Sequence, residues 1–343
     1  MSLDYKSSGV DIDADSESVN RIKSIVKTTH TNAVLTGLGS FGAMYDLSEI
    51  KNYKNPVLIQ SIDGVGTKVK IASMVGKYET LGEDIVNHSC NDIVCQGAKP
   101  LTFLDYIASY KTEPQIIEEI VSGMAKACRE AAVSLIGGET AEMTNVYAPN
   151  ERDIAGCITG VVEKEKLITG NNIKEGDVIL GLASSGLHTN GFSLVRKIFF
   201  DLNNFPVTHK FAELDAPLGE ELLKPHRNYT KSVLGVLEKF EVKGLAHITG
   251  GGLIENVPRI LPDGLSAEIK KGSWPVWPIF SLMQKLGQVA ETEMFRVFNM
   301  GLGMILVVAA AEVERIVQAF GNSSENTYVI GRIVKGERKT ILI

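Results

Sequence analysis

Short apolar runs that end in glycines and polar residues recur along the chain. The first, residues 57–62, stops at Asp63 and leads through Gly64 and Gly66 to Lys68. Runs of apolar and β-branched residues predict buried strands, and glycines permit tight turns that expose backbone N–H groups. A carboxylate that can hold a hard cation and an ammonium that can meet a phosphate share this turn, which favours a nucleotide-phosphate site. The alternative is an ordinary charged strand-to-helix turn.

Three further apolar runs predict strands that open into glycine-bearing loops. Residues 133–136 lead into the segment 137–143, which contains Glu139. Residues 177–183 lead into a loop rich in hydrogen-bonding groups, namely Ser184, Ser185, Gly186, His188, Thr189, Asn190 and Gly191. The last run leads into His247, Thr249, Gly250, Gly251 and Gly252. Helices are predicted after the last two loops, and helix N-termini attract anions; a surface turn and a flexible linker are the respective alternatives.

The spacing of apolar residues predicts the helices between these loops. They are expected at residues 15–30, 79–97, 113–132, 192–200 and 220–240. Lys23 lies on the surface of the first. On the second, Asp84, His88 and Asp92 recur every four residues beside Asn91, with apolar residues on both sides. This stripe is either a metal-binding face or a solvated face, and the flanking apolar residues favour a functional role for Asp92.

The segment 37–42 satisfies the pattern G-x-G-x-x-G, with Asp63 about twenty residues further on. A dinucleotide-binding fold needs a strand before this pattern and a long apolar helix after it. Here residues 28–32 precede the pattern and the polar stretch 46–55 follows it. We therefore predict a glycine-rich loop and reject the dinucleotide-binding fold.

Length and composition bound the class of protein. The 343 residues favour two domains, and the charged segment 163–176 marks the junction between an N-terminal domain at 1–170 and a C-terminal domain at 171–343. The 35 Lys and Arg against 41 Asp and Glu give a net charge of −6 without a basic block, which disfavours nucleic acid as a partner. No apolar run reaches the roughly 18 residues of a membrane span, and no signal-peptide pattern is present, so we expect a cytoplasmic protein.

The candidate residues are all of types that metal-binding and phosphate-binding sites use. Asp63, Asp92 and Glu139 are carboxylates suited to Mg²⁺, Lys68 can contact phosphate, and the glycine-bearing loops can bind anions. No Walker A pattern is present in the sequence. Together these features predict an ATP- and Mg²⁺-dependent enzyme that transfers a phosphoryl group to a second anionic substrate, since such catalysis is mostly positioning and charge neutralisation.

Several motifs also occur in the order found in one enzyme family. They are the segments 5–13, 63–68, 91–92, 137–143, 184–191, 247–252, 255–259 and 298–301. Together they resemble the phosphoribosylformylglycinamidine cyclo-ligases, or AIR synthetases, over essentially the whole chain. Any one motif alone would be weak, but their joint occurrence in order is specific.

This resemblance implies an ATP-dependent ligase of purine biosynthesis. In that family ATP activates the formyl amide oxygen of formylglycinamidine ribonucleotide. The amidine nitrogen then closes the imidazole ring, which gives 5-aminoimidazole ribonucleotide, ADP and phosphate. Phosphorylation is needed because an amide oxygen is otherwise a very poor leaving group.

The resemblance also implies the fold. It is an α+β fold of two α/β-type domains, in which the N-terminal domain binds ATP and its sheet forms a β-barrel across a homodimer. The C-terminal domain would bind the substrate and its phosphate. The alternation of strands and helices alone predicts instead a conventional α/β sheet.

Individual residues receive roles from the same resemblance. Mg²⁺ would be held by Asp63, Asp92 and Glu139. The nucleotide would contact Lys23, Asp63, Gly64, Gly66, Thr67, Lys68, Asn91, Asp92 and Glu139. The substrate and its 5′-phosphate would contact Ser185, Gly186, His188, Asn190, Gly191, Thr249, Gly250, Gly251 and Gly252. The expected catalytic residues are His188, His247 and Lys68, and the histidines suit proton transfer near neutral pH.

The chain departs from the family pattern at two positions. Thr144 stands where proline is usual, and His88 occupies a commonly apolar position. Selenophosphate synthetase, thiamine-monophosphate kinase and a hydrogenase-maturation protein share the architecture, but the first needs an early Cys or selenocysteine, whereas Cys90 is the first cysteine here. The maturation protein ends in Cys, whereas this chain ends in Ile343. A catalytically silent nucleotide-binding subunit is the alternative from another functional class.

Overall fold

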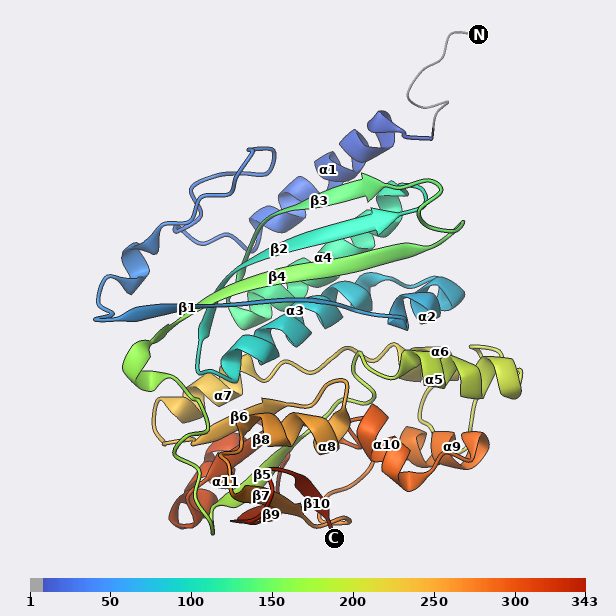
Figure 1. The fold of residues 1–343 in the computed structure, drawn as a ribbon. Coiled ribbons are helices and arrows are strands. Elements are labelled where there is room, and N and C mark those ends of the chain that lie inside the picture. The colour runs from blue at the N-terminus through green and yellow to red at the C-terminus, as the bar shows by residue number, and fades with distance from the viewer. Residues whose placement is uncertain (1–8) are drawn as a thin grey trace, which may run out of the picture. The chain divides into compact units, whose positions relative to one another are not determined.

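The computed structural model describes residues 9–343, which form two compact units (Figure 1). The first unit comprises residues 9–93 and Lys99–Glu165, and the second comprises Val94–Ala98 and Lys166–Ile343. The chain therefore passes into the second unit within the charged segment 163–176. Residues 5–8, the start of the first family motif, lie outside the described residues.

The first unit is built on a four-stranded sheet with strand order β1-β4-β2-β3. Its strands are β1 (Pro56–Gly64), β2 (Lys99–Ser109), β3 (Ser134–Glu142) and β4 (Arg152–Glu163). β4 is antiparallel to β1 and β2, whereas β3 runs parallel to β2. The helices are α1 (Ile12–Lys27), α2 (Lys68–Val75), α3 (Glu79–Val94) and α4 (Pro114–Ala131), with short 3₁₀ turns at Leu47–Ile50 and Lys164–Lys166.

Helices α3 and α4 lie together against one face of this sheet (Figure 1). A Cβ atom on Gly156 of β4 would overlap Phe103 of β2 and lie 2.9 Å from Ile85 of α3, so helix and sheet meet closely there. Gly82 of α3 and Gly123 of α4 bring the two helices together, because a Cβ atom on either would overlap the backbone of the other helix. The position of α3, which carries Asp92, is thus fixed from two sides.

The other face of this sheet carries exposed apolar side chains. Ile62 of β1 and Leu104 of β2 both pair in register with Cys157 of β4, so the three side chains project to the same side. Ile62 is 73% exposed and Leu104 is 40% exposed, and Leu58 and Tyr106 are exposed as well. An apolar face of this kind is typical of an interaction surface.

The second unit is built on a six-stranded sheet with strand order β10-β7-β9-β5-β8-β6. Its strands are β5 (Val178–Ala183), β6 (Gly244–His247), β7 (Leu265–Ile269), β8 (Leu302–Val308), β9 (Thr327–Lys335) and β10 (Thr340–Leu342). Its helices are α5 (Phe192–Arg196), α6 (Leu218–Leu222), α7 (Thr230–Leu237), α8 (Gly252–Asn256), α9 (Pro278–Gly287), α10 (Glu291–Val297) and α11 (Val313–Gly321). A π-helical turn spans Lys197–Leu202, and 3₁₀ turns span Val257–Ile260 and Ala310–Glu312.

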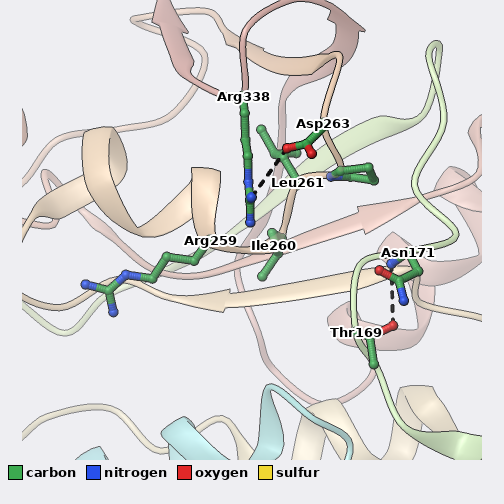
Figure 2. Close-up of a pocket in the computed structure, with 8 residues that line it drawn as sticks. Thr169, Asn171, Arg259, Ile260, Leu261, Asp263 and Arg338 are labelled. Atoms are coloured by element: carbon green, nitrogen blue, oxygen red, sulfur yellow. Dashed lines mark hydrogen bonds and ion pairs between the residues drawn. The ribbon is translucent and has the colours of Figure 1, made fainter.

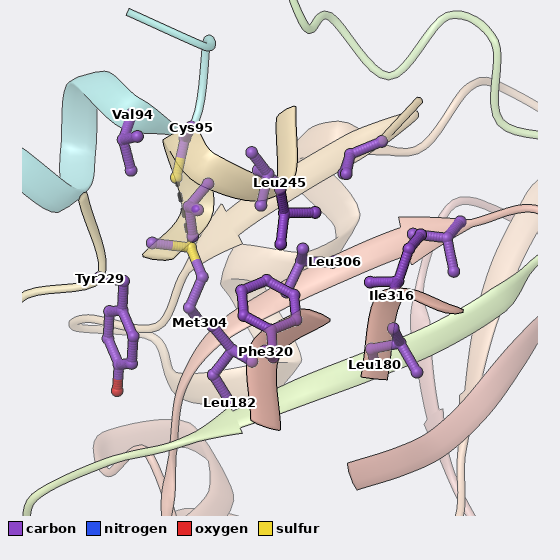
Figure 3. Packing of buried hydrophobic residues seen from close by; sticks show 14 residues of the cluster. Val94, Cys95, Leu180, Leu182, Tyr229, Leu245, Met304, Leu306, Ile316 and Phe320 are labelled. Atoms are coloured by element: carbon purple, nitrogen blue, oxygen red, sulfur yellow. Dashed lines mark hydrogen bonds between the residues drawn. The ribbon is translucent and has the colours of Figure 1, made fainter. Parts of the chain in front are cut away.

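A buried apolar cluster forms the core of the second unit (Figure 3). Leu180 and Leu182 of β5 pack with Leu306 of β8 and with Ile316 and Phe320 of α11. The central strands β5 and β8 are apolar on both sides, as expected for strands covered on both faces. This core holds the ends of β5 and β6, from which the two substrate loops predicted from the sequence emerge.

Two expectations from the sequence require correction. Residues 220–240 are not one helix, because α6 ends at Leu222 and α7 begins at Thr230. Pro225 lies between them, and proline lacks the N–H and the space that a continuing helix requires. The sheets are also mixed and mainly antiparallel, which agrees with the α+β class and not with a conventional parallel α/β sheet. As expected, only a 3₁₀ turn follows the glycine-rich segment 37–42.

Candidate functional site

An imidazole lies between two predicted metal ligands in the first unit. His88 Nε2 is 2.6 Å from Asp63 Oδ2 and 3.7 Å from Asp92 Oδ2. His88 and Asp92 lie one turn apart on α3, and Asp63 comes from the end of β1. Ser61 Oγ donates a hydrogen bond to Asp92 Oδ2 at 3.1 Å. The structure thus brings Asp63 and Asp92 to one place, through His88, the middle residue of the stripe predicted on this helix.

The electrostatics of this cluster depend on His88. Burial alone would lower the pKa of His88, but its hydrogen bond to Asp63 and the neighbouring carboxylates outweigh burial and raise the pKa. A protonated His88 compensates the two acids. Asp63 is 44% and Asp92 27% exposed, so their oxygens can reach an incoming ion. Carboxylate oxygens are the ligands that Mg²⁺ prefers, so the pair fits this cation.

Lys68 and Asp84 form a fully buried ion pair in the first unit. Lys68 Nζ lies 2.8 Å from Asp84 Oδ2, and both side chains are 0% exposed. Burial lowers the pKa of Lys68, and the charge of Asp84 opposes that shift. The pair ties the first turn of α2 to α3. This geometry does not fit the expected roles of Lys68 in phosphate contact and catalysis. It also does not fit Asp84 as a metal ligand, because the Asp84 carboxylate is fully buried against Lys68.

Glu139 is exposed on β3, away from the other two predicted metal ligands. Asp63 pairs with Gly156, which pairs with Asp105, which pairs with Gly138. Three strand spacings of about 4.8 Å therefore separate β1 from β3, and Glu139 also projects to the opposite face from Asp63. Within one chain, this arrangement does not bring Glu139 to the same ion as Asp63 and Asp92.

Asp105 is an acid that the sequence analysis missed. Burial raises the pKa of Asp105 to about 7, with a contribution from the charge of Glu139. A Cβ atom on Gly138 would overlap the Asp105 carboxylate, so that glycine makes room for it. The available signal was an aspartate within the apolar strand 101–110.

The remaining nucleotide contacts predicted in the first unit are placed as follows. Gly66 has a φ of +56°, which a glycine adopts without strain, and Thr67 precedes α2 at its N-cap. Asn91 is buried on α3. Lys23 is exposed on α1, where its Nζ donates to Asn20 Oδ1 at 3.0 Å.

The two predicted substrate loops are adjacent in the second unit. A Cβ atom on Gly250 would lie 3.5 Å from Asn190 Nδ2. Asn256 Nδ2 lies within hydrogen-bond distance of the carbonyl oxygens of Thr249, Gly250 and Gly252, at 2.9 to 3.3 Å, which fixes the glycine loop. Asn190 Oδ1 is buried and has no hydrogen-bond partner among residues 9–343. A buried polar atom of this kind is a candidate ligand-binding atom.

Hydrogen bonds hold the first substrate loop against its surroundings. Ser184 Oγ and Asn299 Nδ2 both donate to the carbonyl oxygen of Gly186 at 2.9 Å. Ser185 Oγ donates to the carbonyl oxygen of Pro225 at 2.5 Å. Gly191 has a φ of +80° and would overlap Phe298 if it carried a Cβ atom. These contacts, and the burial of most of its residues, distinguish the loop from a surface turn.

Three histidines meet beside this loop. His188 is 1% exposed, and its ring stacks on that of His226 with a centroid distance of 3.9 Å. His226 Nε2 lies 2.9 Å from His247 Nε2, and His226 Nδ1 lies 3.3 Å from Thr189 Oγ1. His188 and His247 are brought together as catalytic candidates, but His226 was missed because it fell inside the predicted helix 220–240. The signal that could have revealed it was Pro225 directly before it.

A cavity of about 280 Å³ in the second unit contains none of the predicted site residues (Figure 2). It is lined by Thr169, Asn171, Arg259, Ile260, Leu261, Pro262, Asp263 and Arg338. Figure 2 shows Arg338 directed at Asp263, 3.5 Å away, while Arg259 extends away from that pair.

Within residues 9–343, no helix is long and apolar enough to cross a membrane.

Family models and curated relatives match nearly the whole chain. The AIR synthase related protein N-terminal domain matches residues 43–162, and the AIR synthase related protein C-terminal domain matches residues 174–343. The chain is 52% identical over 336 residues to a phosphoribosylformylglycinamidine cyclo-ligase of Bacillus cytotoxicus, covering 98% of this chain and 96% of the relative. It is 50% identical over 342 residues to the protein of that name from Bacillus mycoides, covering 100% and 99%.

Solved structures with lower identity share the fold. Thiamine-monophosphate kinase from Stenotrophomonas maltophilia has a TM-score of 0.71 at 15% identity, covering 95% of each chain. HypE of E. coli, a hydrogenase maturation protein, has a TM-score of 0.67 at 16% identity, covering 96% of this chain and 92% of HypE. A HypE structure in complex with ATP has a TM-score of 0.66 at 16% identity, covering 94% of this chain and 90% of that one.

Proposed function

The chain belongs to the AIR synthase related protein family, and we propose that it catalyses the ATP-dependent ring closure of formylglycinamidine ribonucleotide to 5-aminoimidazole ribonucleotide. The observation that carries this proposal is the sequence identity of 50–52% to cyclo-ligases over nearly the full length of both chains. The kinase and maturation protein that share the fold are far less similar in sequence. As an enzyme of nucleotide biosynthesis, the protein would act in the cytoplasm.

The reaction needs two kinds of assistance. ATP phosphorylates the formyl amide oxygen, and the amidine nitrogen then attacks the activated carbon, loses a proton and displaces phosphate. The first step requires neutralisation of phosphate charge, and the second requires a group that accepts the proton. ATP is also the ligand named for a HypE structure of the same fold.

Asp63 and Asp92 are the residues we assign to Mg²⁺. A bound Mg²⁺ would neutralise the phosphates of ATP during transfer. Asp63 is positioned by the end of β1 and Asp92 by α3, and backbone groups at Gly64, Gly66 and Thr67 follow in the same turn. Asn91 and Lys23 are further nucleotide contacts in this proposal. Glu139 belongs to a different part of the nucleotide site, since it lies on the other face of the sheet.

The loops at 184–191 and 249–252 are the proposed substrate site. Their contact residues are Ser185, Gly186, His188, Asn190, Gly191, Thr249, Gly250, Gly251 and Gly252. The buried Oδ1 of Asn190, which has no partner among residues 9–343, supports this assignment. His188 and His247 are the proposed proton-handling groups, because both lie at this loop pair.

A homodimer with a β-barrel across the subunits is the proposed assembly. The apolar face formed by Leu58, Ile62, Leu104 and Tyr106 supports it, because burial of such a face by a second copy would remove it from water. Glu139 projects from this same face, so a nucleotide contact by Glu139 would lie near the subunit contact.

The activity is tested by incubating the protein with ATP, Mg²⁺ and formylglycinamidine ribonucleotide. We expect ADP and an aminoimidazole product in equal amounts. Asp92→Asn should lower kcat/KM strongly, whereas Glu79→Gln, an exposed position on the same helix, should not. ADP without aminoimidazole would indicate a kinase, and nucleotide binding without either product would indicate a catalytically silent subunit.

A further inference from the structure

The cavity of about 280 Å³ in the second unit has no part in the proposed reaction (Figure 2). Two arginines line it: Arg259 on the 3₁₀ turn Val257–Ile260, and Arg338 in the turn between β9 and β10. Asp263 supplies a carboxylate. Two guanidinium groups against one carboxylate give the lining side chains a net charge of +1. The cavity therefore favours an anion.

Arg338 is held with its guanidinium group at the cavity wall. Its backbone N–H donates to the carbonyl oxygen of Leu265 at 2.9 Å, and its Nε donates to the carbonyl oxygen of Pro258 at 3.2 Å. The backbone of Arg338 has a φ of +55°, which glycine would adopt without strain. Such strain occurs at ligand-binding positions. The guanidinium group thus lies beside the residue that directly precedes Arg259.

The carboxylate of Asp263 is only loosely attached to this arginine. Arg338 Nη1 lies 3.5 Å from Asp263 Oδ1, and the two side chains are 50% and 94% exposed. An exposed ion pair of this length contributes little to stability. An anion with more charge and more acceptor oxygens can therefore displace Asp263 from Arg338.

Arg259 offers a second guanidinium group. It is exposed, and its side chain has no hydrogen-bond or ion-pair partner among residues 9–343. Figure 2 shows it extending away from the Arg338–Asp263 pair. Because Arg338 Nε is bonded to the carbonyl of Pro258, the neighbour of Arg259, rotation of the long Arg259 side chain can bring both guanidinium groups to one anion.

The loop at residues 169–171 adds neutral hydrogen-bond donors. Thr169 Oγ1 accepts a hydrogen bond from the backbone N–H of Asn171 at 3.5 Å. Within the part of the chain that the structure describes, neither the Thr169 hydroxyl nor the Asn171 side-chain amide donates to another residue. Gly170 has a φ of +81°, and a Cβ atom there would overlap the carbonyl oxygen of Ile260. The glycine thus lets this loop close directly onto the turn that carries Arg259.

We propose that this cavity binds a phosphate group, either as inorganic phosphate or as a small phosphate monoester. The planar forks of Arg259 and Arg338 match the oxygens of a phosphate dianion, and Thr169 and Asn171 can donate to the remaining oxygens. Pockets for drug-sized molecules enclose roughly 300–1,000 Å³, so this cavity suits a small anion. It shares no lining residue with the proposed substrate loops, and the proposal does not depend on the ring-closure activity.

The test is titration calorimetry of the full chain with inorganic phosphate, without nucleotide or substrate. We expect Arg259→Gln and Arg338→Gln each to weaken binding at this site by at least about 10-fold, because each removes a charge-assisted contact. Arg338→Lys keeps the charge but loses the fork, so it should weaken binding as well. Asp263→Asn should tighten binding by about two- to fivefold, because it removes the carboxylate that competes with phosphate.

Matched controls separate this site from general attraction and from the substrate loops. Arg315→Gln and Arg332→Gln remove the same charge from exposed arginines of the second unit that pair with glutamates, and the phosphate affinity should stay at the wild-type value. Asn190→Ala changes the first substrate loop and should leave this affinity unchanged. If Arg338→Gln does not fold, Arg259→Gln and Asp263→Asn at exposed positions still decide the result.

The outcomes are distinct. Ribose 5-phosphate that binds more tightly than inorganic phosphate would identify the ligand as a monoester, and weaker binding would identify it as the free ion. The proposal is wrong if the wild type binds no phosphate at millimolar concentration, or if Arg259→Gln and Arg338→Gln bind it as the wild type does. An equal loss in Arg315→Gln and Arg332→Gln would overturn it too, as would acetate binding as tight as that of phosphate.

Discussion

Asp105 couples the stability of the first unit to pH. Burial raises its pKa to about 7 from 3.8, so the folded protein prefers the protonated carboxyl. The contribution of the protonated Asp105 carboxyl to the free energy of unfolding is fully present below the pKa of the unfolded state. It is lost as the pH rises through about 7, the pKa in the folded state. We expect Asp105→Asn to raise the melting temperature relative to the wild type, and to raise it more at pH 8 than at pH 5. Calorimetry at both pH values, with the exposed Asp215→Asn as control, measures this; equal gains at both would contradict it.

Mutation can distinguish a structural role of the buried Lys68–Asp84 ion pair from a catalytic role of Lys68. Lys68→Ala removes the cation beside a fully buried carboxylate, so we expect a loss of about 3–5 kcal/mol in the free energy of unfolding. The double variant Lys68→Met with Asp84→Leu removes both charges at similar volume and should recover most of that stability. Urea denaturation measures both. If the double variant is stable but its KM for ATP is raised, that result would support the phosphate contact expected of Lys68.

At the scale of elements, the contact between α3 and α4 sets the position of His88 and Asp92. A Cβ atom on Gly123 would overlap the backbone of Glu79, and a backbone cannot yield as a flexible side chain can. We therefore expect Gly123→Ala to destabilise the protein by about 1–3 kcal/mol and to weaken Mg²⁺ binding. Gly235→Ala in α7 is the matched control, because nothing lies within 4 Å of its Cβ position and alanine favours a helix. Equal effects of the two substitutions on the melting temperature would exclude this packing argument.

At the scale of the whole molecule, the exposed face of the first sheet should decide the oligomeric state. Ile62→Glu places a charge in the middle of the apolar face, where burial by a second copy would cost several kcal/mol. We expect the wild type to sediment as a dimer at micromolar concentration and Ile62→Glu to sediment as a monomer. Val329→Glu, at an exposed apolar position on β9 in the second unit, should remain a dimer. If the wild type sediments as a monomer, the proposed homodimer is wrong.

The sequence was sufficient for the features that depend on local pattern. Apolar runs ending in glycines located β1, β3, β5 and β6 and the loops that follow them, because burial and turn chemistry are encoded within a few residues. Four-residue spacing placed His88 and Asp92 on one face of α3. The order of the motifs indicated the family, to which the chain does belong.

Only the tertiary structure decided which of these groups meet. Lys68 is charged and follows a glycine turn, yet packing buries it against Asp84, 16 residues further on. Strand order separates Glu139 from Asp63, although both end apolar runs in the same unit. His226 reaches His247 because Pro225 interrupts a helix and the chain folds back onto β6. Such pairings depend on strand order, register and long-range packing, which local propensity and spacing do not specify.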